Sequence, residues 1–156
     1  MANKNNNEVL RRIADALNFD ADKITEILSN EGYEAESDLV SKFLTEESNA
    51  ACPDDVMSYF LDGLISYRRG KKEEETESEP KDIKKITNNT ILKKLKIAFD
   101  LKSEDMLDIF DLVYFDITKQ ELTALFRREG HKNYKTCPDN YLINFLKGIK
   151  MRYAEE

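Results

Sequence analysis

The chain has 156 residues, of which 40% are hydrophobic and 35% charged, and its formal net charge at pH 7 is −7. This length suits one ordinary domain or two very small ones. The sequence contains no run of about 18 apolar residues, which excludes a membrane-spanning helix. The first residues, MANKNNNEV, lack the apolar core of a signal peptide, so we expect a cytoplasmic protein.

An internal repeat organises the sequence. The segment 6–13, NNEVLRRI, recurs as NNTILKKL at 88–95, an offset of 82 residues. The block CPDD at 52–55 recurs as CPDN at 137–140, an offset of 85. The change in offset predicts an insertion in a loop of the second copy, because loops tolerate insertions that helix interiors do not.

Apolar residues follow a helical period in both copies, and no segment alternates for long enough to predict a strand. Each copy contains four apolar stripes and is therefore predicted to form four helices. The stripes of the first copy are Val9, Leu10, Ile13 and Leu17; Ile24, Ile27 and Leu28; Leu39, Val40 and Phe43; and Val56, Met57, Phe60, Leu61 and Leu64. Those of the second copy are Ile91, Leu92, Leu95, Ala98 and Phe99; Met106, Leu107, Ile109, Phe110 and Val113; Leu122, Leu125 and Phe126; and Tyr141, Leu142, Phe145, Leu146, Ile149 and Tyr153.

Two local signals refine these elements. Thr118 and Glu121 have the spacing of a capping box, which predicts the start of the third helix of the second copy. Gly63 and Gly148 occupy equivalent mid-helix positions, where glycine costs about 1 kcal/mol relative to alanine. The repetition of this cost predicts a close helix crossing in each copy. Simple tolerance of a weak helix former is the alternative.

Residues 71–86 separate the copies, and the segment 70–82 contains no apolar residue. We therefore predict a charged, flexible linker, with an acidic interaction tail as the alternative. The fold class follows as all-α, with similar four-helix units at 1–70 and 87–156. We expect the units to pack together with pseudo-two-fold symmetry, because about 70 residues provide only a thin core.

Charge is divided unevenly between the copies. The net charge is −7 for residues 1–70, −3 for 71–82 and +3 for 83–156. The two copies are therefore predicted to present different surfaces on a common fold. The leading candidate for a binding surface is a basic and aromatic loop together with the start of the helix that follows it: Arg127, Arg128, His131, Lys132, Tyr134, Lys135 and Cys137.

Such a mixture can contact phosphates and stack on bases. It also follows a stretch that resembles a helix-turn-helix, with one helix near 103–112, a turn near 113–117 and a helix from Thr118. The negative net charge is not the usual footprint of a nucleic-acid-binding protein. We therefore favour contact with an unidentified protein partner, and keep a nucleic-acid-binding regulator as the alternative.

Each cysteine precedes a proline near the predicted start of a helix. A helix N-terminus can lower the pKa of a thiol, so a thiol-dependent enzyme or redox sensor using Cys137 is a lesser alternative. The other interpretation of Cys52 and Cys137 is a small side chain that fills the helix entry. His131 is the sole histidine, which leaves too few ligands for a structural zinc site. We expect no metal, no cofactor and no catalytic residues.

The motifs NNTILKKL at 88–95, ELTALFRR at 121–128, GHKNYKTC at 130–137 and NFLKG at 144–148 resemble the YehS-like family. These are small bacterial proteins built from two copies of a helical domain of unknown function. The first copy departs from this pattern at 43–50, where the basic, aromatic and histidine residues are missing. The resemblance implies the fold and supplies no activity. The sequence thus predicts a non-enzymatic binding or regulatory module.

Overall fold

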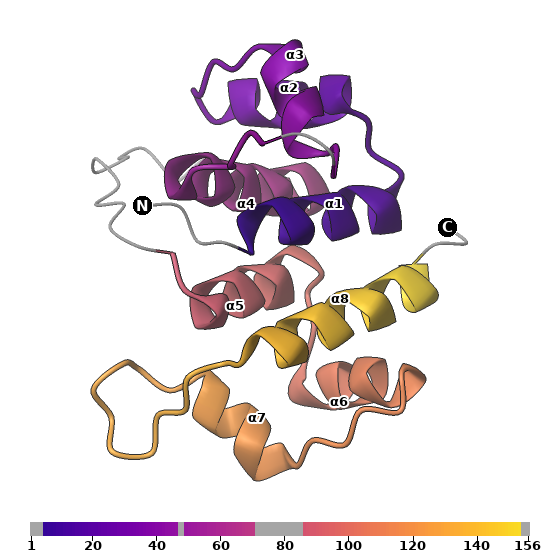
Figure 1. Cartoon of the computed structure of the whole chain (residues 1–156). Coiled ribbons are helices and arrows are strands. Elements are labelled where there is room, and N and C mark those ends of the chain that lie inside the picture. Colours follow the sequence, from indigo (N-terminus) through magenta and orange to yellow (C-terminus); the bar gives the residue numbers. More distant parts are fainter. Residues whose placement is uncertain (1–4, 47–48, 71–85, 154–156) are drawn as a thin grey trace.

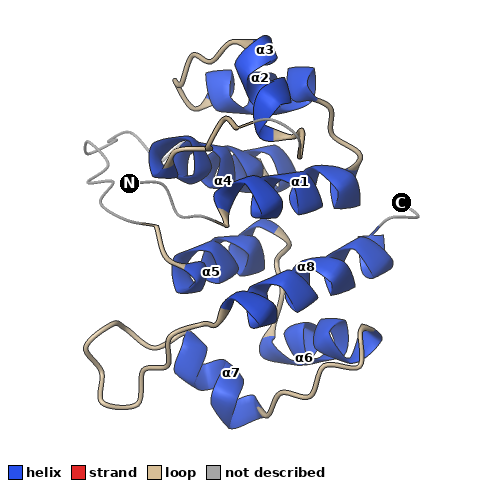
Figure 2. Ribbon diagram, in the orientation of Figure 1, coloured by secondary structure: helices blue, strands red, loops and turns tan. Residues whose placement is uncertain are grey.

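The computed structural model of the protein describes residues 5–46, 49–70 and 86–153. Within these ranges the regular structure consists of eight helices and includes no strand, as the hydrophobic period predicted (Figure 2). The helices of the first copy are α1 (Asn6–Leu17), α2 (Ala21–Asn30), α3 (Ser37–Phe43) and α4 (Asp54–Arg69). Those of the second copy are α5 (Asn88–Ala98), α6 (Ser103–Leu112), α7 (Lys119–Leu125) and α8 (Asp139–Tyr153).

The first and last helices of both copies form the middle of the molecule (Figure 1). α1 packs against α8, and α4 packs against α5, so each contact joins the first helix of one copy to the last helix of the other. α2 and α3 cover this middle layer at one end, and α6 and α7 cover it at the other (Figure 1). Exchanging the copies exchanges the two contacts, which is the pseudo-two-fold arrangement predicted from the repeat.

One apolar core runs through both copies, so the expected docking of the two units is present. Its large side chains include Phe43 and Phe60 from the first copy and Phe110 and Phe145 from the second, none more than 2% exposed. Each such residue contributes about 1.5–3 kcal/mol through burial. A shared core stabilises two small units because the fraction of surface buried on folding rises with the size of the folded unit.

Gly63 and Gly148 lie at close helix crossings, which confirms their predicted packing role. A Cβ atom at Gly63 would lie 2.6 Å from Cγ2 of Ile27 on α2 and 2.9 Å from the carbonyl oxygen of Ile27. A Cβ atom at Gly148 would lie 2.6 Å from Cγ2 of Ile109 on α6, and closer still to its carbonyl oxygen. Only glycine therefore lets α4 approach α2, and α8 approach α6, this closely.

The predicted capping box is present at the start of α7. The Glu121 amide donates to Oγ1 of Thr118 over 3.0 Å, and the Thr118 amide donates to Oε1 of Glu121 over 3.5 Å. The linker prediction needs one adjustment at its end. Ile86 is only 5% exposed, and its amide donates to Oδ2 of Asp54 over 3.1 Å, so this residue belongs to the core. The remainder, residues 71–85, lies outside the described residues.

Tyr114 takes a left-handed backbone conformation at the end of α6, with φ of 56°. Its amide donates to the carbonyl oxygen of Asp111, and the Phe115 amide donates to that of Phe110, both over 3.0 Å. This pair of bonds is the Schellman pattern that ends many helices, usually with glycine at the left-handed position. The counterpart at the end of α2 is indeed a glycine, Gly32, with φ of 87°.

We expect Tyr114→Gly to raise the free energy of unfolding by about 1 kcal/mol. A non-glycine residue in the left-handed region costs about 1–2 kcal/mol, part of which is offset by the greater entropy of glycine in the unfolded chain. The side chain is 95% exposed, so its removal sacrifices no buried contact. Urea denaturation provides the measurement, with Tyr114→Ala as the control that removes the ring but keeps Cβ. Equal or lower stability of the glycine variant would refute the strain argument.

Candidate functional site

The second asparagine of each Asn-Asn pair anchors the loop before the last helix of its copy. Nδ2 of Asn89 donates to the carbonyl oxygens of Leu125 and Lys135, over 2.9 and 2.8 Å. Its Oδ1 accepts a bond from the Cys137 amide over 2.9 Å. One side chain at the start of α5 therefore holds both ends of the loop between α7 and α8. This loop projects from the body of helices (Figure 1).

The first asparagine of the pair completes the network. Nδ2 of Asn88 donates to the carbonyl oxygen of Cys137 over 3.0 Å and to Oδ1 of Asp139 over 2.7 Å. The first copy repeats these bonds. Asn7 donates to the carbonyl oxygens of Phe43 and Ala50 and accepts from the Cys52 amide, and Asn6 donates to the carbonyl oxygen of Cys52 and to Oδ1 of Asp54. The repeated NN and CP motifs are thus parts of one structural anchor. The matching bonds also place the insertion of the second copy within residues 126–134.

Cys137 has the surroundings of a structural residue. It is 1% exposed, and its Sγ lies 3.6 Å from the carbonyl oxygen of Pro138. Burial, together with the negative charge of Asp139, raises the pKa of the Cys137 thiol to about 12. Cys52 has the same surroundings, and burial beside Asp55 and Asp54 raises the pKa of its thiol to about 12 as well. Both raised pKa values oppose the thiolate that a thiol-dependent enzyme or redox sensor needs.

We expect both cysteines to resist alkylation by iodoacetamide in the folded protein at neutral pH. A pKa of about 12 against an ordinary 9.0 leaves about a thousandfold less thiolate, and burial blocks the reagent in addition. Mass spectrometry of the native protein, with the urea-unfolded protein as control, measures both rates. Native alkylation of Cys137 at the rate of the unfolded chain would contradict this assignment.

The structure brings together three of the residues predicted to form the binding surface. Arg127, Arg128 and Tyr134 line a hollow of about 390 Å³ on the second copy, together with Thr90 and Lys93 from α5. Glu129 is the one acidic residue that lines it. The loop side chains therefore face a helix that lies more than thirty residues earlier in the sequence.

The other predicted binding residues do not line this hollow, although Nε2 of His131 lies 3.5 Å from a guanidinium nitrogen of Arg127. Nζ of Lys135 contacts Oε2 of Glu121 at 3.1 Å and the hydroxyl of Tyr141 at 3.2 Å, so Lys135 braces α7 against α8. Hydrogen bonds to the Tyr141 hydroxyl and to Glu121 raise the pKa of Lys135. Hydrogen bonds from Lys135 and, to a smaller extent, from Tyr141 lower the pKa of Glu121. His131 and Lys132 are exposed on the outer part of the loop. Cys137 is part of the anchor and does not line the hollow.

Sequence reasoning missed the contribution of α5. Lys93 also lines a second hollow of about 350 Å³ with Lys96, Phe126 and Arg127. The ammonium group of Lys96 lies 5.7 Å from the centre of the Phe126 ring, within reach of a cation–π interaction. The available signal was the stripe of lysines on the side of α5 opposite its apolar face. The two hollows share Lys93 and form what we term the basic face: Lys93, Lys96, Phe126, Arg127, Arg128 and Tyr134.

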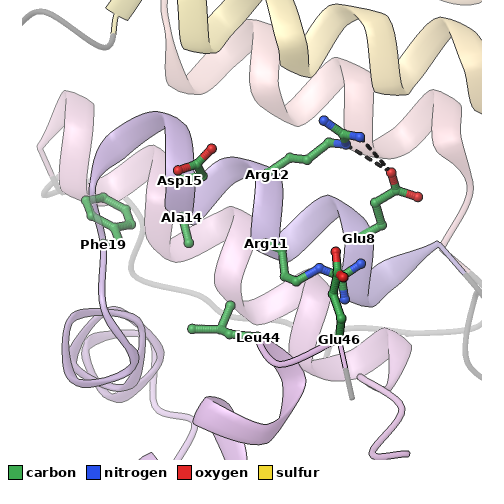
Figure 3. A pocket seen from close by; sticks show the side chains of 8 residues that line it. All are labelled: Glu8, Arg11, Arg12, Ala14, Asp15, Phe19, Leu44 and Glu46. Carbon is green, nitrogen blue, oxygen red and sulfur yellow. Dashed lines mark hydrogen bonds and ion pairs between the residues drawn. The ribbon is translucent and has the colours of Figure 1, made fainter. Parts of the chain in front are cut away.

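The first copy provides an internal comparison for the basic face. The corresponding hollow, of about 430 Å³, lies over α1 and carries both signs of charge (Figure 3). Two arginines, Arg11 and Arg12, line it together with the carboxylates of Glu8, Asp15 and Glu46. Arg12 is paired with Glu8, and Nη2 and Oε2 are 2.9 Å apart (Figure 3).

Alignment of the copies shows how the charges differ. The carboxylates of Glu8 and Asp15 are replaced by Thr90 and Ile97, and Ala14 by Lys96. Glu46 lies in the loop that carries the insertion, so the alignment gives it no fixed counterpart in the second copy. Arg11 keeps its charge as Lys93. On α5 the second copy therefore has neither of these two carboxylates and has one additional lysine, and Glu129 is the acidic residue that lines its hollow. This surface is thus more basic than its counterpart in the first copy.

The helix-turn-helix prediction is accurate in its boundaries, since α6 and α7 are joined by the turn 113–118. α7 is only seven residues long, which gives it about two turns. Among the described residues, no group of three or more His, Cys, Asp or Glu side chains is placed to hold a metal ion. No helix in the described part of the chain combines the length and apolarity needed to cross a bilayer.

These features define a tandem-repeat, all-α protein in which both repeats carry the asparagine anchor and the second carries a basic face. The chain belongs to the family described as "Protein of unknown function (DUF1456)", which matches residues 6–70 and 88–153. It is similar to "Uncharacterized protein YehS" from Escherichia coli (strain K12), with 38% identity over 149 residues that cover 94% of each chain. No solved structure matches the chain significantly. The comparisons confirm the family resemblance seen in the sequence motifs.

Proposed function

We propose that the protein is a non-enzymatic binding module whose basic face takes an acidic segment of a partner protein. The observation that carries this proposal is the difference between the copies on one shared fold. The hollow over α1 combines two arginines with three carboxylates, whereas its counterpart presents Lys93, Lys96, Arg127 and Arg128 against the single carboxylate of Glu129. Unbalanced cations beside the exposed part of an aromatic ring suit a carboxylate-rich peptide.

The rest of the chain favours a short acidic segment over a long polyanion. The net charge of −7 repels an extended polyanion that approaches from a distance. Screening by salt limits the attraction of the four cations of the basic face to about 8–10 Å, which suits a local contact. The short α7 also offers little length for insertion into a major groove.

A nucleic-acid-binding regulator is the second candidate. The specific support for it is the position of Tyr134 and Phe126 among the cations, next to the helix-turn-helix-like pair α6–α7. Nucleic-acid binding combines phosphate contacts with base stacking on aromatic rings. It would show a steep dependence on salt, because each neutralised phosphate releases counterions.

Fluorescence anisotropy with a labelled decaglutamate peptide, a short DNA duplex and a single-stranded RNA distinguishes the two candidates. We expect decaglutamate to bind, and Lys93→Glu or Arg128→Glu to weaken it at least about tenfold, because each reverses a charge at the surface. Arg11→Glu, at the position equivalent to Lys93, is the matched control and should change the affinity less than about twofold.

Two outcomes would contradict the proposal of an acidic peptide ligand at the basic face. Tighter binding of DNA or RNA than of decaglutamate, with a steep loss at physiological salt, would favour the second candidate. Equal effects of Lys93→Glu and Arg11→Glu would remove the basic face as the working surface.

A further inference from the structure

A separate pocket of about 520 Å³ lies between α4 and α5, where the two copies meet. Its volume falls within the range of small-molecule sites, about 300–1,000 Å³. Both helices contribute charged, hydroxyl and apolar side chains to its lining. The pocket therefore has the mixed chemistry of a ligand site, and its position at the junction of the copies differs from that of the basic face.

The charges in this pocket do not balance. Lys94 and Asp62, which both line it, form a short ion pair across the junction and neutralise each other. The two other cations, Arg69 and Lys93, have no carboxylate partner among the described residues. A guanidinium nitrogen of Arg69 lies 3.5 Å from the carbonyl oxygen of Ile97, a long contact that leaves most of its donors available. Within the described residues, the pocket thus carries two positive charges that no ion pair neutralises.

The pseudo-symmetry indicates that this pocket is specific to one junction. Its apolar wall includes Ile65 from α4 and Ile97 from α5. The equivalent positions at the other junction, on α8 and α1, are Lys150 and Asp15. These two form an ion pair, with Nζ and Oδ2 2.5 Å apart. The junction between α1 and α8 therefore has an ion pair at these positions, whereas the junction between α4 and α5 has two isoleucines that line a pocket.

We propose that the pocket between α4 and α5 binds a small phosphate monoester that carries an apolar group. Arg69 and Lys93 would hold the phosphate, whose charge of about −1.5 to −2 at pH 7 matches the charge of these two cations. The planar guanidinium of Arg69 suits bidentate contact with phosphate oxygens, and the hydroxyl of Thr90 adds a donor. Ile65 and Ile97 would cover the apolar part of the ligand.

This proposal shares Lys93 with the proposed function, but the two can be tested separately. Lys93 lines both the pocket and the basic face. Arg69 lines only the pocket, and Arg127 and Arg128 line only the basic face. An Arg69 variant therefore reports on the small ligand without altering the surface proposed for the acidic peptide.

The probe is phenyl phosphate. Inorganic phosphate and phenol are the two controls, which supply the anionic group and the aromatic ring separately. We expect saturable NMR shift changes at the amides of Ser66, Arg69 and Ile97, with phenyl phosphate binding more tightly than either fragment. Arg69→Ala should weaken phenyl phosphate about tenfold or more, since it removes one charged contact. Its decaglutamate affinity should stay unchanged.

A second pair of variants keeps the test independent of any loss of folding. Ile65→Lys combined with Ile97→Asp copies the ion pair of the other junction into the pocket and should abolish binding while the helical circular dichroism persists. Arg11→Ala, at the position equivalent to Lys93, should bind phenyl phosphate as the wild type does. Unchanged affinity in Arg69→Ala, shift changes confined to the basic face, or absence of binding to the wild type would each overturn the proposal.

Discussion

Asn89→Ala is expected to lower the free energy of unfolding by about 3–5 kcal/mol, an effect as large as that of truncating a buried core side chain. The Asn89 side chain satisfies three backbone groups, which are the carbonyl oxygens of Leu125 and Lys135 and the amide of Cys137. Asn89 is 8% exposed, so water cannot readily replace the lost partners. Each buried group left without a partner costs about 1–3 kcal/mol.

Urea denaturation followed by circular dichroism measures this effect. Asn144→Ala is the matched control, because Nδ2 of Asn144 also donates to a backbone carbonyl oxygen, that of Asn140, but at an exposed site. The control should cost less than about 1 kcal/mol. A loss of this small size for Asn89→Ala would show that the asparagine pair does not anchor the loop.

Gly148→Ala is expected to destabilise the protein by about 1–3 kcal/mol, against the helix propensity, which favours alanine by about 1 kcal/mol. The added methyl group would overlap the backbone of Ile109 on α6. A backbone atom cannot rotate away as a side-chain atom can, so α8 must move from α6 and disturb the core.

The control for this prediction is Lys147→Ala, an exposed position one residue earlier on α8, which should change stability by less than about 0.5 kcal/mol. Gly63→Ala should act in the same direction as Gly148→Ala, because its Cβ would meet Ile27 in the equivalent crossing. A stabilising effect of Gly148→Ala would mean that helix propensity outweighs packing at this crossing.

Much of the fold was predictable because its causes are local or repeated. The apolar stripes gave the number of helices in each copy, and the spacing of Thr118 and Glu121 located the start of α7. The equivalence of Gly63 and Gly148 predicted two helix crossings. Both copies keep a glycine at a position where it lowers helix propensity, which indicates that packing requires it there. The pairing of α1 with α8 was not predictable, because the hydrophobic period shows that a face is buried without showing against which helix.

The candidate site was predictable only in part. Charge and spacing drew attention to Arg127, Arg128 and Tyr134, which do line one hollow. The same criteria could not show that Lys93 faces them from another helix, nor that Lys135 is engaged by Glu121. Tertiary contacts determine which cations of a basic segment remain available to bind a ligand, and the local sequence does not predict these contacts.

The most direct test of functional division between the copies is an NMR titration of the isotopically labelled full chain with decaglutamate. We predict that the amides of Lys93, Lys96, Arg127 and Arg128 shift in a saturable way, and that those around Arg11 on α1 stay in place. Equal shifts at the hollows of both copies, or shifts confined to the first copy, would contradict the assignment of the working surface to the second.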